Sequence, residues 1–103
     1  MTHQSAAGQQ GVCLRGHRRC ASPAEVELIK RHLPLHLRLT RAEPGCLAFD
    51  VRPTADPLVW RVEERFRDRA AFDAHQRRTR ASDWGAATAG IERRYQITGL
   101  ERD

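Results

Sequence analysis

Residues 46–66, CLAFDVRPTADPLVWRVEERF, contain two runs of alternating apolar and polar residues separated by a proline-rich connection. In the first run, Cys46–Arg52, the apolar residues of one face are Leu47, Phe49 and Val51. In the second run, Leu58–Phe66, one face carries Leu58, Trp60, Val62, Glu64 and Phe66. A period of two is typical of β-strands, and a short connection between two such runs favours a hairpin. We therefore predict an antiparallel hairpin in which Glu64 is a single carboxyl group on an apolar face.

The residues before this hairpin predict a strand, a helix and a turn. Val12–Cys20 alternates with period two, which indicates a strand. A helix should begin after Ser22, which is followed by a proline and an acid in the first turn, and should end near Thr40. Pro34 cannot donate a backbone hydrogen bond, so we expect this helix to kink or restart there. Glu43-Pro44-Gly45 then indicates a turn into the hairpin.

The residues after the hairpin predict a second helix and a last strand. Asp68 is a suitable N-cap for a helix with one stripe formed by Ala71, Phe72, His75 and Thr79. Trp84 follows in what we expect to be a break at Ser82–Gly85, and Ile91–Thr98 alternates as a strand. The order is β-α-β-β-α-β. This order predicts an α+β, ferredoxin-like split βαββαβ fold, a four-stranded antiparallel sheet with two helices on one face.

The length and composition suit one small globular domain. The chain has 103 residues, of which 40% are hydrophobic and 30% charged, and no apolar run is long enough to span a membrane. We expect residues 1–10 to be a disordered polar tail and residues 11–103 to form the single domain. The tail lacks the pattern of a secretory signal, so the expected location is cytoplasmic. Three cysteines without CxxC spacing predict free thiols and no metal site.

The net charge of +5 comes from 18 basic and 13 acidic side chains. A nucleic-acid surface needs basic residues clustered on one face, whereas the arginines here are scattered among acids, as in residues 61–69, and only Arg77, Arg78 and Arg80 form a tight basic run. We expect no nucleic-acid partner and no membrane partner. The sheet face that the helices leave bare carries charges of both signs, so it could face either water or a second subunit.

Two motifs stand out in the hairpin and the second helix: Glu43-Pro44-Gly45-Cys46-Leu47 followed by Phe49-Asp50-Val51, and Glu64-Arg65-Phe66 followed by Ala71-Phe72 and Ala74-His75. These motifs carry a resemblance to the antibiotic biosynthesis monooxygenase family. With the flanking strands it spans about residues 12–99. It implies a homodimer joined through the sheet faces, a dimeric α+β barrel, with a pocket between sheet and helices in each subunit. It also implies an oxidoreductase similar to quinol monooxygenases, which convert small phenols or quinols to quinones with O₂ and no cofactor.

Two departures from the family pattern concern individual positions. The strand before the second helix usually carries a tryptophan two residues after the acid, where this chain has Phe66. An aromatic wall is kept, but the indole N–H donor is lost. Relatives that degrade haem use a histidine about one helical repeat beyond His75, where this chain reads Ser82-Asp83-Trp84-Gly85. This difference argues against haem binding.

Oxidation of a phenol or quinol with O₂ and no cofactor needs a dry aromatic cavity, a base to form the phenolate and polar groups to hold the oxyanion. Glu64 and His75 are the candidate catalytic pair, because both lie on faces expected to meet in the interior. The candidate substrate-binding residues are Trp60, Phe66, Trp84, Tyr95 and His36. No metal ligand and no cofactor site are predicted; the expected partners are a small aromatic substrate, O₂ and a second copy of the chain.

Other interpretations of the same residues remain. Glu64 and His75 could form a structural polar contact with each other or with an arginine. The aromatic residues on the strands also fit a packed core. At the level of function, the alternatives are a binding module of the same fold that holds a small aromatic molecule without converting it, and a haem-binding or haem-degrading relative.

Overall fold

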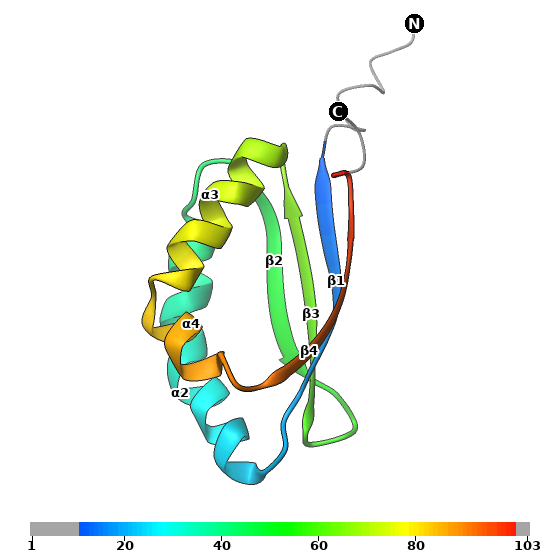
Figure 1. The fold of residues 1–103 in the computed structure, drawn as a ribbon, viewed down its shortest axis with the longest axis vertical. Helices are drawn as coiled ribbons and strands as arrows, with labels where there is room; N and C mark the ends of the chain where they lie inside the picture. The colour runs from blue at the N-terminus through cyan, green and yellow to red at the C-terminus, as the bar shows by residue number, and fades with distance from the viewer. Residues whose placement is uncertain (1–10, 101–103) are drawn as a thin grey trace, which may run out of the picture.

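The computed structural model describes residues 11–100, which form one α+β unit (Figure 1). The expected tail at residues 1–10 lies outside the described part. The elements, in chain order, are β1 (Val12–Arg19), α2 (Pro23–Arg41), β2 (Cys46–Pro53), β3 (Val59–Phe66), α3 (Arg69–Arg80), α4 (Asp83–Thr88) and β4 (Glu92–Thr98). No helix within residues 11–100 is long and apolar enough to cross a bilayer.

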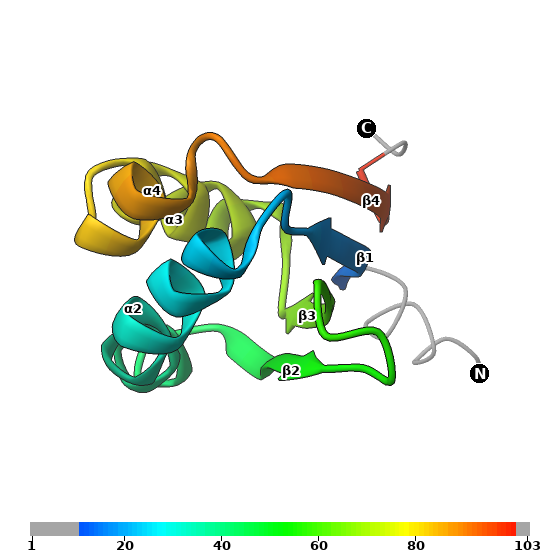
Figure 2. The same ribbon diagram turned by 90° about the horizontal axis from the view of Figure 1, so that it is seen from below.

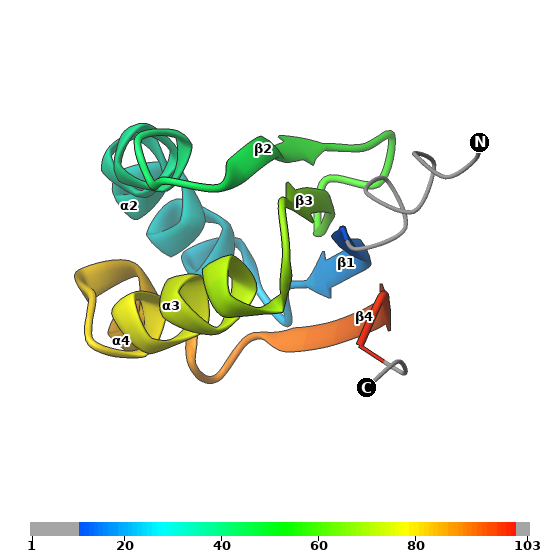
Figure 3. The ribbon, with the colours of Figure 1, turned by 90° about the horizontal axis from the view of Figure 1, so that it is seen from above.

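The four strands form one antiparallel sheet in the order β2-β3-β1-β4. The helices α2, α3 and α4 all lie on the same side of this sheet, as the end-on views show (Figures 2 and 3). The predicted ferredoxin-like fold is therefore confirmed. The face of the sheet that the helices cover, the inner face, forms the core with them. The opposite face, the outer face, is covered by no element of the described chain.

The register of the two central strands decides which side chains reach the core. Leu14 of β1 lies opposite Glu64 of β3, and Arg18 lies opposite Trp60. Because every second residue of a strand points to the same face, all four of these side chains belong to the inner face. The inner face is thus mostly apolar but contains one buried carboxyl group and one buried guanidinium group.

The first helix differs from the prediction at two points. α2 continues without interruption from Pro23 to Arg41, so the restart expected at Pro34 does not occur. Packing of the buried residues of α2 on both sides of Pro34 compensates for the missing backbone donor. Ser22 occupies the N-cap position, but its side chain makes no capping hydrogen bond. Glu25 instead accepts a hydrogen bond from the backbone N–H of Ala21, at 2.7 Å.

The hairpin contains an irregularity that the alternation does not predict. The pairing of β2 with β3 shifts between Cys46 and Ala48, which leaves Leu47 as a bulge residue. Leu47 is 54% exposed, so its predicted place on one face with the buried Phe49 is wrong. The preceding turn is as expected, and Gly45 takes a positive φ of 88°, a conformation that suits glycine.

The expected break at Ser82–Gly85 is wrong, because this stretch begins the short helix α4. The Ser82 hydroxyl accepts a hydrogen bond from the backbone N–H of Gly85, at 3.1 Å, which caps the helix. At Gly85 a Cβ atom would lie 2.1 Å from the carbonyl oxygen of Thr79, so glycine permits the close approach of α4 to the end of α3. As a result, Trp84 is held in a helix and buried.

Candidate active site

A cavity of about 240 Å³ lies between the inner face of the sheet and the helices. This volume is just below the usual range for sites of drug-sized ligands, so the cavity suits a molecule of one ring. The lining side chains come from all four strands and from α2, α3 and α4: Leu14, Arg18, His36, Phe49, Val51, Val62, Glu64, His75, Gln76, Thr79, Trp84, Arg93, Tyr95 and Ile97.

Most of the side chains predicted for the site come together in this cavity. Of the seven predicted residues, five line it: His36, Glu64, His75, Trp84 and Tyr95. The other two, Trp60 and Phe66, are buried in the hydrophobic core and are not part of the lining.

Glu64 is buried on the cavity wall because β3 is a central strand. It lies opposite Leu14 of β1 and Phe49 of β2, and it is 7% exposed. Burial raises the pKa of its carboxyl group to about 7, against the opposing effect of the Arg18 charge. Within the described residues, its Oε1 atom has no hydrogen-bond partner. Glu64 can therefore change between its acid and its carboxylate form near neutral pH.

His75 reaches the cavity from α3 and is 2% exposed. Its Nδ1 atom lies 3.0 Å from Oε1 of Glu43, while its Nε2 atom lies 3.3 Å from Oγ1 of Thr79 and 3.8 Å from Oε1 of Glu64. Burial lowers the pKa of the imidazole despite the nearby Glu43 carboxylate. A carboxylate at Nδ1 favours the tautomer with its proton there, which leaves Nε2 as an acceptor facing Glu64.

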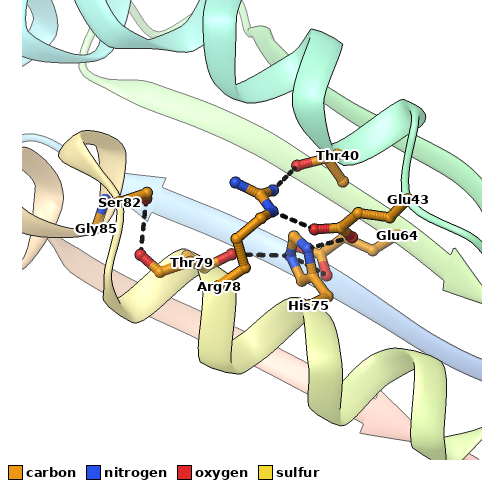
Figure 4. Close-up of polar contacts among 8 residues, drawn as sticks. All are labelled: Thr40, Glu43, Glu64, His75, Arg78, Thr79, Ser82 and Gly85. Atoms are coloured by element: carbon orange, nitrogen blue, oxygen red, sulfur yellow. Dashed lines mark hydrogen bonds and ion pairs between the residues drawn. The ribbon is translucent and has the colours of Figure 1, made fainter.

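Glu43 and Arg78 continue the chain of polar contacts that begins at His75 (Figure 4). Their side chains are more exposed than that of His75, at 16% and 30% against 2%. Arg78 donates from Nε to Oε2 of Glu43 and from Nη2 to Oγ1 of Thr40, the latter at 2.8 Å. In the sequence, Glu43 is recognisable only as part of a turn, and Arg78 only as one of a run of arginines. Periodicity cannot reveal their roles, because their contacts join residues more than 30 positions apart.

His36 and Trp84 form a stacked pair, with ring centroids 4.7 Å apart and ring planes within 5°. Burial, together with the nearby His75, lowers the pKa of His36 to about 3, so its ring is neutral at pH 7. Both rings also line a second depression, which lies between α2 and the junction of α3 with α4 and includes Leu35 and Leu39. The stacked pair therefore lies between the cavity and this second depression.

The remaining predicted aromatic residues lie in two different environments. Tyr95 of β4 lines the cavity, and burial raises the pKa of its hydroxyl group. Trp60 belongs to the hydrophobic core. Phe66 is also in the core, where its ring centroid lies 4.8 Å from that of His75 and 5.9 Å from that of Phe72. Phe66 thus supports the His75 ring rather than forming a wall of the cavity.

Arg18 is a cavity residue that no sequence motif singles out. It is 5% exposed, and its Nη1 atom donates to the carbonyl oxygens of Thr88 at 2.9 Å and Ile91 at 3.3 Å. Its guanidinium carbon lies 5.7 Å from the centre of the Trp84 ring. The period-two pattern of β1 does indicate a buried position for Arg18, since it places this arginine on the same face as Leu14.

The side chains of the site are suited to proton transfer. Within residues 11–100, no three His, Cys, Asp or Glu side chains are grouped so that they could hold a metal ion. The arrangement offers a carboxyl group that titrates near neutrality, a neutral imidazole oriented by a second carboxylate, and a buried guanidinium group. These groups can accept a proton from a bound hydroxyl and stabilise the resulting oxyanion.

Comparison with known proteins identifies the class. The sequence pattern of the antibiotic biosynthesis monooxygenase family matches residues 19–87, about two thirds of the chain. The chain therefore belongs to the antibiotic biosynthesis monooxygenase family, and the resemblance carried by its motifs is confirmed. Among curated proteins, none matches this chain.

Solved structures support the fold over nearly the whole chain. Rv0793 from Mycobacterium tuberculosis is 22% identical with a TM-score of 0.68, covering 90% of this chain and 97% of its own. A candidate antibiotic biosynthesis monooxygenase from Nitrosomonas europaea is 19% identical with a TM-score of 0.72, covering 87% and 89%. PA3566 from Pseudomonas aeruginosa is 22% identical with a TM-score of 0.65, covering 91% and 95%. At these identities, the likeness concerns the fold alone.

Proposed function

We propose that this protein is a monooxygenase that oxidises a small electron-rich phenol or quinol with O₂ inside the cavity, without a cofactor. The observation that carries the proposal is the Glu64 carboxyl group, whose Oε1 atom has no hydrogen-bond partner in the described chain. Its pKa of about 7 allows it to accept a phenolic proton near neutral pH. Membership of the family supports the reaction class.

The residues around Glu64 support a route for the proton. A proton on Glu64 can reach the Nε2 atom of His75, 3.8 Å away, after a small approach of the two side chains and a rotation of the Thr79 hydroxyl group, which lies 3.3 Å from the same nitrogen. The positive charge that then forms on the imidazole faces the Glu43 carboxylate at Nδ1. Glu43 thereby orients and stabilises His75, as the third residue of a catalytic triad orients the base of that triad.

The phenolate is the species that reacts with O₂. Conversion of a phenol to a quinone removes four electrons from the ring, with one oxygen atom entering the product and the other leaving as water. The protein's part is to form the phenolate, to hold it against the Trp84 and Phe49 rings, and to keep the bound molecule away from bulk water.

Oxygen uptake with a panel of hydroquinones and naphthols tests this proposal. We expect turnover by the wild type and a loss of at least about 100-fold in kcat/KM for Glu64→Gln and His75→Ala. Glu63→Gln is the matched control, because Glu63 directly precedes Glu64 in β3 and its side chain is on the outer face, paired with Arg61. This variant should keep wild-type turnover.

Two results would contradict the proposal. One is uptake at the uncatalysed rate across the panel; the other is full activity in Glu64→Gln. If the compounds raise the melting temperature but no oxygen is consumed, the protein is instead a binding module for small aromatic molecules. A Soret shift on titration with hemin would indicate the haem-binding alternative.

A further inference from the structure

Arg18 is a cation buried without a matching anion. Its side chain is at the cavity wall and only 5% exposed. Two backbone carbonyl groups accept hydrogen bonds from Nη1, but within residues 11–100 the Nε atom has no partner. No carboxylate of the described chain forms an ion pair with the guanidinium group. The guanidinium group of arginine is a cation in proteins.

The other titratable groups of the cavity do not neutralise Arg18. Glu64 is the only carboxyl group in the lining, and burial raises its pKa to about 7, so it is only partly ionised at neutral pH. His36 and His75 are neutral, because burial lowers the pKa of both. Arg93 adds a second positive charge to the lining. The lining of the cavity therefore has an excess of positive charge.

A buried ion without a partner is costly, and an anion that enters the cavity would remove this cost. The planar guanidinium group matches a carboxylate in shape and charge, and its Nε–H is buried without a hydrogen-bond partner in the described chain. The position of Arg18 suits this role. It is four residues along β1 from Leu14, which lies opposite Glu64, so the backbones that carry the two charged side chains are about 13 Å apart along the strands.

We propose that the substrate of this cavity is an aromatic acid, whose carboxylate binds Arg18 while its phenolic hydroxyl group lies next to Glu64 and His75. This inference rests on the proposed function for the role of the hydroxyl group. Arg18 then determines specificity, and Glu64 and His75 act on the reacting end. A single ring that carries both a carboxylate and a hydroxyl group offers one group to Arg18 and the other to Glu64 and His75, all of which line the cavity.

The test compares two probes of nearly the same shape, 2,5-dihydroxybenzoate and 2,5-dihydroxybenzamide, which differ in charge. Binding is measured without oxygen by quenching of tryptophan fluorescence, since Trp84 lines the cavity. We expect the wild type to bind the benzoate at least about tenfold more tightly than the benzamide. Arg18→Met should bring the two affinities within about twofold, whereas Arg18→Lys should keep part of the preference.

Arg94→Gln is the matched control, because Arg94 is on β4 but exposed and paired with Glu92. It should keep the full preference for the benzoate. Equal binding of the two probes by the wild type, absence of binding by both, or an unchanged preference in Arg18→Met would each overturn the proposal. Circular dichroism checks the fold of the variants, and the wild-type comparison stands even if Arg18→Met does not fold.

Oxygen uptake separates this inference from the proposed function. A preference for the benzoate without oxygen consumption would support the aromatic-acid site and contradict the monooxygenase. Oxygen consumption with neutral hydroquinones and no preference for the benzoate would support the monooxygenase and contradict the role of Arg18.

Discussion

Glu64 and His36 are buried titratable groups of the same cavity whose pKa values shift in opposite directions. The pKa of Glu64 is raised to about 7 and that of His36 is lowered to about 3, in both cases chiefly because burial disfavours the charged form. Each shift links folding to pH. The two effects overlap between about pH 4.5 and 6.5, where they have opposite signs and partly cancel in the wild type.

The free energy of unfolding of Glu64→Gln, compared with that of the wild type, should increase as the pH rises. The unfolded chain loses the Glu64 proton near the ordinary glutamate pKa of 4.5, whereas the folded protein keeps it until about pH 7. The wild type therefore loses stability over this range, by about 3 kcal/mol at about 1.4 kcal/mol per pKa unit. Urea unfolding from about pH 4 to 8 measures the difference between variant and wild type. A difference that does not change with pH would contradict the prediction.

His36→Phe should have the opposite dependence on pH. The unfolded chain binds a proton at His36 below the ordinary histidine pKa of 6.5, while the folded protein resists protonation down to about pH 3. The wild type loses stability as the pH falls through this range, and phenylalanine keeps a ring against Trp84 without titrating. Between about pH 6.5 and 4.5 the variant should gain about 3 kcal/mol relative to the wild type. Melting curves at several pH values test this; a constant difference would count against it.

Some residues of the site can be predicted from the sequence and others cannot, for a physical reason. Alternation places Glu64 on an apolar face, and helical spacing places His75 on a buried stripe, so both follow from local patterns. The contact between His75 and Glu43 does not follow from a local pattern, because Glu43 approaches His75 only when the turn after α2 packs against α3. The pattern of β1 contains Arg18, but only the structure shows that it is buried without a carboxylate beside it.

At the scale of elements, α4 is the part that sequence periodicity misses. Six residues are too few to give a clear helical pattern, and the helix depends on its cap and on packing against α2 and α3. The bulge at Leu47 is missed for a similar reason, because one extra residue shifts the faces of a strand without changing its composition. The existence and type of the longer elements, with several turns or residue pairs each, follow from the sequence pattern, although α2 runs through Pro34 without the restart expected there.

Ser82→Ala should destabilise the protein by about 1 kcal/mol, because it removes the side-chain cap of α4. Ser22→Ala is the matched control, since Ser22 holds the same position at α2 without a side-chain hydrogen bond. It should change the free energy of unfolding by no more than a few tenths of a kcal/mol. Chemical denaturation measures both, and equal losses in the two variants would contradict the assignment of the cap.

At the scale of the whole molecule, the two faces of the sheet differ in what covers them. The helices cover the inner face, and the outer face carries charged side chains of both signs, among them Arg61 paired with Glu63 and Arg94 paired with Glu92. A surface of this kind can pair with a rotated copy of itself. We propose that two copies of the chain associate through their outer faces.

Light scattering at micromolar concentration should give twice the monomer mass of 11.7 kDa. Glu63→Arg should weaken the dimer, because it removes the acid beside Arg61 and makes this part of the outer face basic. Glu27→Arg reverses a charge on the exposed side of α2, where Glu27 pairs with Lys30, and should leave the mass unchanged. A wild type that is monomeric under these conditions would contradict the proposed assembly.

The bulge at Leu47 also hinders the assembly of this chain into fibrils. β2 and β4 are the edges of the sheet, and an open edge can add strands from other molecules without limit. β2 is interrupted by the bulge at one end and by Pro53 at the other, and β4 begins with Glu92, Arg93 and Arg94. Both edges thus resist further pairing, so growth by strand addition is blocked and a closed assembly is favoured over an endless one.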